Sequence, residues 1–359
     1  MPEQYIPTPT DLKKAQSHLT PYQKIASNNR ERAVLAHEQT TQQIATITAG
    51  RPLSELTIPE LQQIKQLYQT EAQALGLTPE TKTTPETKYE QARELMGANF
   101  YGQEEIKNTL GIDFPKTEIP PIPFSPDQLT QAKALGERLI LRVSHDTAGQ
   151  PLTLKRINEI MTPRLAASEE GKLLYNTDWY QNENFYKTTA LKTEWQLVGG
   201  SFIPDSTNKN YIHQTRILRN HLKSLKSLTE TEEQQSSDQK LQELSEQMGV
   251  DWNTQQITNP DKYNKNWKTV AQQLSELQIN QNHRRTPAEI IYDQILQFKK
   301  TKDRGYLATA CDWSSVLASG GSLVDVGYAG SGGAYVSGWY PDSSGGDVGV
   351  VSLRGSSLA

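Results

Sequence analysis

Cysteine is almost absent from this chain, which carries a single one, Cys311, in 359 residues. One cysteine excludes an intrachain disulfide framework and any metal site built from cysteines. Apolar runs of roughly 18 residues, the length that spans a bilayer, are also lacking, so the sequence predicts no membrane span. Because no basic segment followed by an apolar one opens the chain, we expect no signal peptide. The protein is then cytoplasmic by default, with surface display by an unrecognised route left open.

An excess of charge of either sign is missing too. Lys and Arg number 37 against 41 for Asp and Glu, which gives a formal net charge of -4. This balance gives no electrostatic reason to expect nucleic acid or an anionic membrane as a partner. The basic cluster from Arg216 to Lys226 is followed by Glu230, Glu232 and Glu233, which favours a solvated helix face.

Recognisable catalytic and metal-binding patterns are absent as well. The six histidines have no HxH, HxxxH or HExxH spacing, and no phosphate-binding P-loop occurs. Ser319-Gly-Gly-Ser322 lacks the strand–turn–helix context of a nucleophile and predicts a turn. Cys311 has no neighbouring base and is predicted to be a buried, small apolar residue. We therefore expect no catalytic residues, no metal and no cofactor, and the chain is not predicted to be an enzyme.

The first half of the chain predicts a helical region and a linker. Start signals at Thr10-Asp11-Leu12 and Thr57-Ile58-Pro59-Glu60, with apolar residues at helical spacing, predict a helical N-terminal region over residues 1–112. A cluster of prolines predicts a stiff linker over residues 113–126: Pro115, Pro120, Pro121, Pro123 and Pro126. The remainder, residues 127–359, is placed in one domain.

That domain mixes strand and helix signals. Strands are expected at 138–144, 195–198 and 201–203, and helices at 127–136, 152–161, 208–226, 237–248, 264–277 and 287–300. The helices of residues 208–300 interrupt the strand pattern and are interpreted as an insertion. The fold class predicted is α+β, a helical N-terminal region followed by a mixed domain with a helical elaboration.

The C-terminal tail has a composition of its own. From Asp303 to Ala359 the chain lacks Lys, Glu, Gln and Asn, which are abundant upstream, and also Met, Ile, Phe and His. Gly, Ser, Val, Ala, Asp and Tyr predominate instead, together with Trp313 and Trp339. Short apolar segments at 323–326, 334–336 and 347–353 are separated by glycine pairs that permit tight turns. Short strands between such turns display most of their side chains in loops or on sheet faces.

The tail resembles the variable region of proteins diversified by diversity-generating retroelements. The resemblance is carried by Ser319-Gly-Gly-Ser322, Gly333-Ala-Tyr-Val336, Gly338-Trp339, Pro341 and Asp347-Val-Gly349 to Arg354. Such proteins end in a C-type-lectin-like fold, and residues 127–359 are expected to adopt it, with the variable region at about 313–354. The chain departs from better-known members at Ala318, Leu323 and Val350-Val351, which indicates a divergent subclass. No calcium–sugar motif accompanies the tail.

The resemblance also accounts for the composition. In that family, diversified codons begin as AAC or AAT and keep a pyrimidine in the third position. They therefore cannot encode Lys, Glu, Gln, Met or Trp, but they readily give Gly, Ser, Asp, Tyr, Val, Ala and Leu. By the same rule Trp313 and Trp339 belong to the framework.

The resemblance implies a ligand-binding protein whose partner is an unidentified macromolecule, a protein in the first instance. Tyr offers large contact area at low entropy cost, while Ser, Gly and Asp adapt to the partner. The residues predicted to bind ligand alternate with or flank the framework: Val316, Leu317, Ser322, Asp325, Gly327, Tyr328, Tyr335, Ser337, Tyr340, Asp342, Ser343, Ser344 and Asp347. A non-catalytic structural or assembly protein with a Gly/Ser-rich β tail is the alternative, and an enzyme of unrecognised type is the third.

Overall fold

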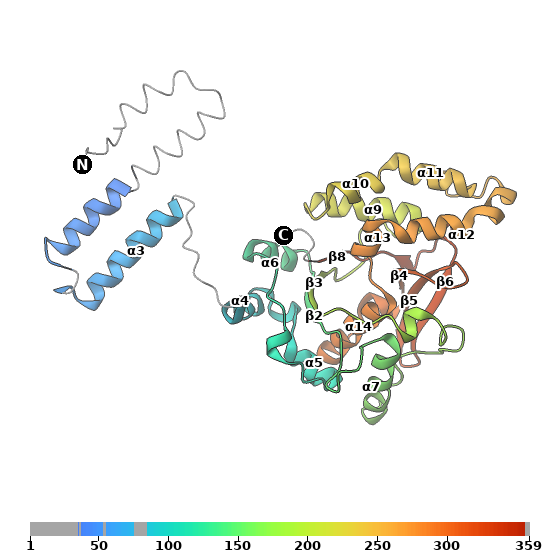
Figure 1. The fold of residues 1–359 in the computed structure, drawn as a ribbon, viewed down its shortest axis with the longest axis horizontal. Coiled ribbons are helices and arrows are strands. Elements are labelled where there is room, and N and C mark those ends of the chain that lie inside the picture. The colour runs from blue at the N-terminus through green and yellow to red at the C-terminus, as the bar shows by residue number, and fades with distance from the viewer. Residues whose placement is uncertain (1–34, 36, 53–54, 75–84, 356–359) are drawn as a thin grey trace, which may run out of the picture. The chain divides into compact units, whose positions relative to one another are not determined.

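The computed structural model describes residues 35, 37–52, 55–74 and 85–355, and the chain divides into two compact units, Met1–Thr84 and Pro85–Ala359 (Figure 1). In the first unit residues 37–48 are helical and α3 spans Ile58–Ala74. Glu60 accepts a hydrogen bond from the backbone N–H of Thr57 at 2.7 Å, a capping contact at the helix start that the sequence predicts. The helix expected from residue 10 falls largely on residues 10–34, outside the described residues.

The second unit begins with helices and short strands and ends with a second group of strands. Its α-helices are α4 (Pro85–Met96), α5 (Gln103–Leu110), α6 (Pro126–Ala134), α7 (Leu154–Ala167), α8 (Asn184–Lys187), α9 (Tyr211–Ser224), α10 (Glu230–Gln235), α11 (Asp238–Met248), α12 (Pro260–Glu276), α13 (Gln278–His283) and α14 (Pro287–Thr301). Its 3-10 helices are η2 (Gly97–Asn99), η3 (Lys116–Glu118) and η4 (Gly305–Ala308). Its strands are β1 (Phe100–Tyr101), β2 (Arg138–Arg142), β3 (Glu194–Val198), β4 (Cys311–Leu317), β5 (Leu323–Gly330), β6 (Gly333–Trp339), β7 (Val348–Gly349) and β8 (Leu353–Arg354).

The predicted boundary at residues 113–126 is wrong, because this segment packs against the domain instead of separating two parts. Phe114 and Ile122 are 2% and 5% exposed and belong to the same core as α4 and α5. The indole N–H of Trp195 on β3 donates to the carbonyl of Pro120 at 3.0 Å. Prolines stiffen the segment, but its apolar residues bury it, so residues 85–112 belong to the C-terminal unit. The structure divides the chain at Thr84/Pro85 instead.

Two 4-stranded sheets organise this unit. One has the order β1-β2-β3-β8 and the other β6-β5-β4-β7. In the first sheet β3 pairs antiparallel with both β2 and β8, so the end of the chain returns to its middle. In the second sheet β4, β5 and β6 form an antiparallel meander, with β7 parallel to β4. Strand β4 escapes the sequence prediction, and the expected strand 347–353 is reduced to β7 and β8. No strand forms at the expected 201–203.

The second sheet is covered on both faces. Val324, Val326 and Val336 face a large core shared with the first sheet and α14. Trp313 and Leu323 face a second core with α9, α11, α12 and α13. Figure 1 shows these helices stacked over β4, β5 and β6, with α7 on the opposite side. Helices form over most of the stretch 208–300, as the sequence predicts; α9 to α13 make up this helical layer, whereas α14 lies in the opposite core.

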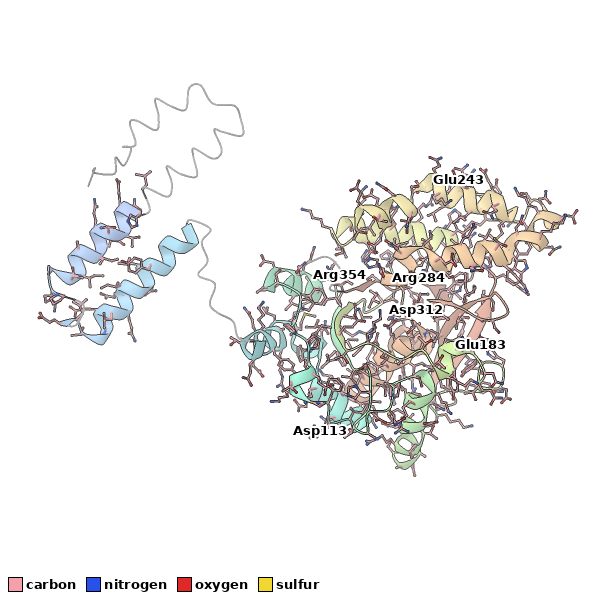
Figure 2. The ribbon with its side chains drawn as sticks, in the orientation of Figure 1. Asp113, Glu183, Glu243, Arg284, Asp312 and Arg354 are labelled. Carbon is pink, nitrogen blue, oxygen red and sulfur yellow. The ribbon has the colours of Figure 1, made fainter. Side chains whose placement is uncertain are left out.

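Buried charges connect α14 to both sheets. Arg142 of β2 contacts Asp293 at 2.7 Å, and Arg285 contacts the same carboxylate at 3.0 Å and Asp312 of β4 at 2.7 Å. These four side chains are at most 1% exposed as residues. Burial opposes ionisation of Asp293, but the two guanidinium groups hold its pKa below the ordinary value. Figure 2 labels Asp312 on β4 and Arg284, which follows α13. Such pairs fix geometry, because breaking one leaves a buried charge unpaired.

No helix among the described residues is both long and apolar enough to cross a membrane. Mixed helices and sheets place the chain in the α+β class that the sequence predicts. Most predicted helices lie within a few residues of the observed ones, and their capping residues set where they begin. Ser125 caps α6 and Thr286 caps α14, each followed by proline in the first turn.

Candidate binding surface

Successive residues of the tail's strands face opposite sides of the second sheet, one toward the core with α14 and the other toward the helical layer. The register pairs Gly327 with Tyr335 and with Cys311, and Asp325 with Ser337 and with Trp313. Side chains alternate along a strand, so these residues share the sheet face of the helical layer. At the β4–β5 turn, Gly321 N–H donates to Ala318 at 2.8 Å, which confirms the predicted turn at Ser319-Gly-Gly-Ser322.

Most of the tail residues predicted to bind ligand reach solvent. Tyr328, Tyr335 and Tyr340 are 40%, 43% and 52% exposed, which is high for large aromatic side chains. Partial or full exposure is shared by Val316, Leu317, Ser322, Ser337, Asp342, Ser343, Ser344 and Asp347. Trp313 is fully buried and Trp339 half-buried, as befits residues predicted to be framework.

Two predicted binding residues are instead interior. Gly327 is buried, and a Cβ there would overlap the carbonyl oxygen of Ala310 and the Cα of Cys311. A side chain at this position would therefore push two strands apart, so the residue cannot vary freely. Asp325 is 2% exposed, and burial raises its pKa to about 6. The prediction that both residues are displayed is wrong because the meander places them under its own strands and the helical layer.

Three tyrosines, Tyr175, Tyr335 and Tyr328, form a continuous group that we call the tyrosine row. Tyr175, itself 52% exposed, stacks on Tyr335 with ring centroids 4.4 Å apart and planes at 19°. Tyr335 meets Tyr328 edge-on at 6.5 Å. Tyr328 donates its hydroxyl to Asp347, which raises the pKa of Tyr328 to about 12. The row thus crosses from a loop, over β6 and β5, to a carboxylate before β7.

The segment before α8 covers the outer edge of β6. The N–H of Ala334 donates to Leu173 at 2.8 Å, and that of Tyr175 donates to Ala334 at 2.9 Å. The indole of Trp179 donates to the carbonyl of Val336 at 2.8 Å, yet its residue is 46% exposed. An edge strand is open to unwanted pairing, and this segment closes much of it. It also adds two exposed aromatic rings beside the tail.

Tyr328 has an unusual backbone conformation. Its φ is 47°, in the left-handed region that bulky residues seldom adopt. The pairing of β5 with β6 is irregular between Gly327 and Gly330, which places Tyr328 at a bulge. Bulges redirect side chains and increase local twist. This geometry turns the Tyr328 ring outward beside Tyr335.

A second aromatic group lies on the helical layer. Trp267 of α12 meets Tyr340 edge-on with centroids 4.6 Å apart, and Tyr263 of the same helix donates its hydroxyl to Asp342. Sequence periodicity places Trp267 in a helix but gives no sign that it contacts the tail. The sequence pattern singles out neither Tyr175 nor Trp179. Contacts far apart in the sequence are not readable from local patterns.

Reactive chemistry is not favoured at Cys311. Its side chain is buried, and burial together with the Asp325 carboxylate raises the pKa of the thiol. A thiol that stays protonated is a poor nucleophile. The prediction of a buried, small residue is thereby confirmed. Within the described ranges, no group of three or more His, Cys, Asp or Glu side chains could hold a metal ion.

A cavity of about 520 Å³ lies elsewhere in this unit. It is lined by residues of α4, α5 and the proline segment, among them Tyr89, Arg93 and Pro120. Ion pairs already occupy its charged wall, as Arg93 contacts Glu104 at 2.8 Å. None of its lining residues belongs to the tail, so it is separate from the candidate surface.

Comparison with known proteins identifies no relative: no family model, no curated protein and no solved structure matches this chain. The α+β class follows from the observed helices and sheets. The C-type-lectin-like architecture and the retroelement resemblance stay predictions.

Proposed function

We propose that this chain is a binding protein whose tail forms a diversified recognition surface on a C-type-lectin-like scaffold. The observation that carries the proposal is the exposure of Tyr328 and Tyr335 on strands whose intervening valines fill the core, and of Tyr340 directly after β6. A monomer gains nothing from exposing several large rings together, whereas a recognition surface does. Tyr is also well suited to recognition, since it immobilises few torsions for the area it buries.

The surrounding structure supports a rigid display. The strands are pinned by buried ion pairs of Arg285 with Asp312 and Asp293, and closed at one edge by the loop around Tyr175. Return of β8 to β3 ties the end of the tail to the middle of the unit. A scaffold held in this way tolerates changes at exposed positions, because those side chains contribute little to the core. We propose a protein as the partner, recognised without catalysis.

Sequencing the gene and its flanks tests this function. The proposal predicts a nearby near-copy of codons 316–354 that differs from the gene only where the copy has adenine. The structure sharpens the expectation, because mismatches should fall on exposed positions such as Tyr328 and Tyr335 and spare Gly327. Absence of such a copy, or mismatches without adenine bias, overturns the diversified surface.

The second candidate is a structural or assembly protein. The observation that favours it is the same exposed aromatic group, since two copies of the chain could bury these rings against each other. If the protein self-associates, it should form a dimer or a larger oligomer. Substitution of Tyr175 and Tyr335 by Ser should then dissociate that oligomer into monomers. Light scattering of the full chain separates the two candidates, and a monomer at all concentrations removes the second.

A further inference from the structure

We propose that the tyrosine row receives an arginine side chain of a protein partner, with the guanidinium stacked on the rings and paired with Asp347. The inference rests on the proposed function and names the chemistry of its partner. It is carried by two observations, the exposed and stacked rings of Tyr175 and Tyr335 and the carboxylates beside them that have no cationic partner.

The carboxylates around the row lack cationic partners. Residues 311–353 contain Asp312, Asp325, Asp342 and Asp347 but no Lys or Arg. Asp312 is neutralised by Arg285 in the interior. Among the described residues, no Lys, Arg or His side chain forms an ion pair with the other three. Asp347 receives only the Tyr328 hydroxyl as a side-chain donor in this part of the structure, so it retains free acceptor positions.

Neighbouring cations sit at the ends of this region. The side chain of Lys268 packs near Gly321 at the β4–β5 turn. Lys172 is exposed, and its backbone N–H donates to Ser331 at the β5–β6 turn. Acidic side chains outnumber these two lysines, because Asp178 and Glu183 also lie near Trp179 in the segment before α8 that covers β6. Glu183 accepts from the N–H of Ser319 at 3.0 Å, and Figure 2 labels it beside the strands.

Two buried polar atoms on the strands β4 and β5 lack partners, although the Asp325 carboxylate does accept a hydrogen bond from the Cys311 thiol. No described residue donates a hydrogen bond to Oδ1 of Asp325 or accepts one from Nε1 of Trp313. Both residues are at most 2% exposed, and the strand register places them side by side. An unpaired buried acceptor is costly. Negative potential from Asp325 and Asp347 therefore adds at the face that carries Tyr335, and a cation bound there relieves it.

Arginine fits this geometry better than lysine. Tyr175 and Tyr335 stack on each other with centroids 4.4 Å apart, so their facing sides are filled and a planar cation would lie on an outer ring face of the stack. A guanidinium stacks on aromatic rings and still donates several hydrogen bonds in its plane to a carboxylate. A lysine ammonium supplies charge but neither the stacking area nor the paired donors. The partner is thus expected to place an exposed arginine on a flat or protruding surface.

Selection from a random linear peptide library, displayed on phage and panned against the full chain immobilised at its N-terminus, tests the inference. Panning is run in parallel on the wild type, Tyr335→Ala, Asp347→Asn and the control Glu243→Gln, an exposed acid on α11 (Figure 2). Arginine is expected to be enriched on the wild type and on the control, and the enrichment is expected to disappear on both surface variants. Melting curves of all four proteins verify that they fold.

The decisive measurement leaves the protein unaltered. An enriched peptide is synthesised with its arginine replaced by citrulline, which keeps the shape and removes the charge. We expect affinity to fall at least about tenfold, the size of one desolvated cation–π contact plus an ion pair. Replacement by lysine should cost less than replacement by citrulline, and salt should weaken binding of the arginine peptide more than that of the citrulline peptide.

The possible outcomes separate the two proposals. Enriched peptides without arginine, or a citrulline peptide that binds equally well, overturn the arginine inference. If such peptides still lose binding on Tyr335→Ala, the proposed function stands without it. If no peptide is enriched on the wild type over Tyr335→Ala, both the inference and the binding function of this face are contradicted.

Discussion

Tyr175 and Tyr335 stack with their ring centroids 4.4 Å apart and both remain exposed, although one belongs to a loop before α8 and the other to the tail. The recognition surface is therefore shared between the tail and a segment outside it. Replacing Tyr175 by Ala should weaken peptide binding several-fold while the melting temperature changes little, because the ring is 52% exposed. Tyr175→Phe keeps the stack and should bind like the wild type. Equal affinity for Tyr175→Ala and the wild type would confine the surface to the tail.

Asp325 gives a pH dependence with a definite sign. Its pKa is about 6 in the folded chain against 3.8 for an ordinary aspartate, because burial disfavours the charged form. The folded state then binds more protons than the unfolded state between these values, so stability falls as the pH rises through this window. Above pH 6 the ionised carboxylate costs about 3 kcal/mol at most.

Asp325→Asn removes this cost. The variant should have a free energy of unfolding about 1–3 kcal/mol higher than the wild type at pH 7, and the difference should disappear near pH 4. Urea unfolding followed by tryptophan fluorescence measures both. A variant that is less stable than the wild type at pH 7 would contradict the account, since it would mean that the hydrogen bond from the Cys311 thiol to the carboxylate outweighs the cost of burial.

The buried arginine network is expected to dominate the stability of the strands. Arg285→Met removes the ion-pair partner of Asp312 in a site where Asp312 is 1% exposed, and should cost about 3–5 kcal/mol. Arg93→Met is the matched control, because Arg93 contacts Glu104 at the surface and its loss should cost less than about 1 kcal/mol. The denaturant midpoints of the two variants, each compared with the wild type, measure the stability that each substitution removes. Similar losses in both would show that burial of the network contributes nothing special.

Gly327 and Gly330 offer a matched pair on one strand. Ala at 327 would overlap the backbone of Ala310 and Cys311, whereas Ala at 330 meets nothing within 4 Å. Gly327→Ala should therefore destabilise the chain by about 2 kcal/mol or more, in the range of overpacked cores, and Gly330→Ala should be nearly neutral. Thermal melts compare them directly. A harmless Gly327→Ala would reopen that position as a diversified one.

The elements with local signals were predictable from the sequence. Ser125-Pro126 and Thr286-Pro287 mark where α6 and α14 begin, and the apolar run at 138–142 forms β2. Strand β4 was missed because Asp312, Ser314 and Ser315 interrupt its apolar pattern. Asp312 is buried only because Arg285 neutralises it, and that contact cannot be read from neighbouring residues. The proline pattern predicts a linker for a similar reason, since the contacts that bury the segment, such as the bond from Trp195 to Pro120, come from residues distant in the sequence.

The sequence predicts which type of residue forms the candidate surface, but not which tail positions are exposed on it. Composition pointed to Tyr328, Tyr335 and Tyr340, and all of them are exposed. Composition does not distinguish exposed from buried positions on a strand, so the prediction for Gly327 and Asp325, which are buried, is wrong. Pairing register decides this, and register depends on bulges and turns that a single sequence leaves unspecified.

Simultaneous replacement of Tyr328, Tyr335 and Tyr340 by Ala tests the central claim most directly. Each ring is at least 40% exposed, so the melting temperature should stay within roughly a few degrees of the wild type. Binding of peptides selected on the wild type should be lost, as expected when clustered aromatic anchors are removed. The triple Phe variant keeps the rings and should retain most of the affinity. A collapse of stability with the Ala variant would instead assign these tyrosines to the core, and unchanged binding would place recognition elsewhere on the molecule.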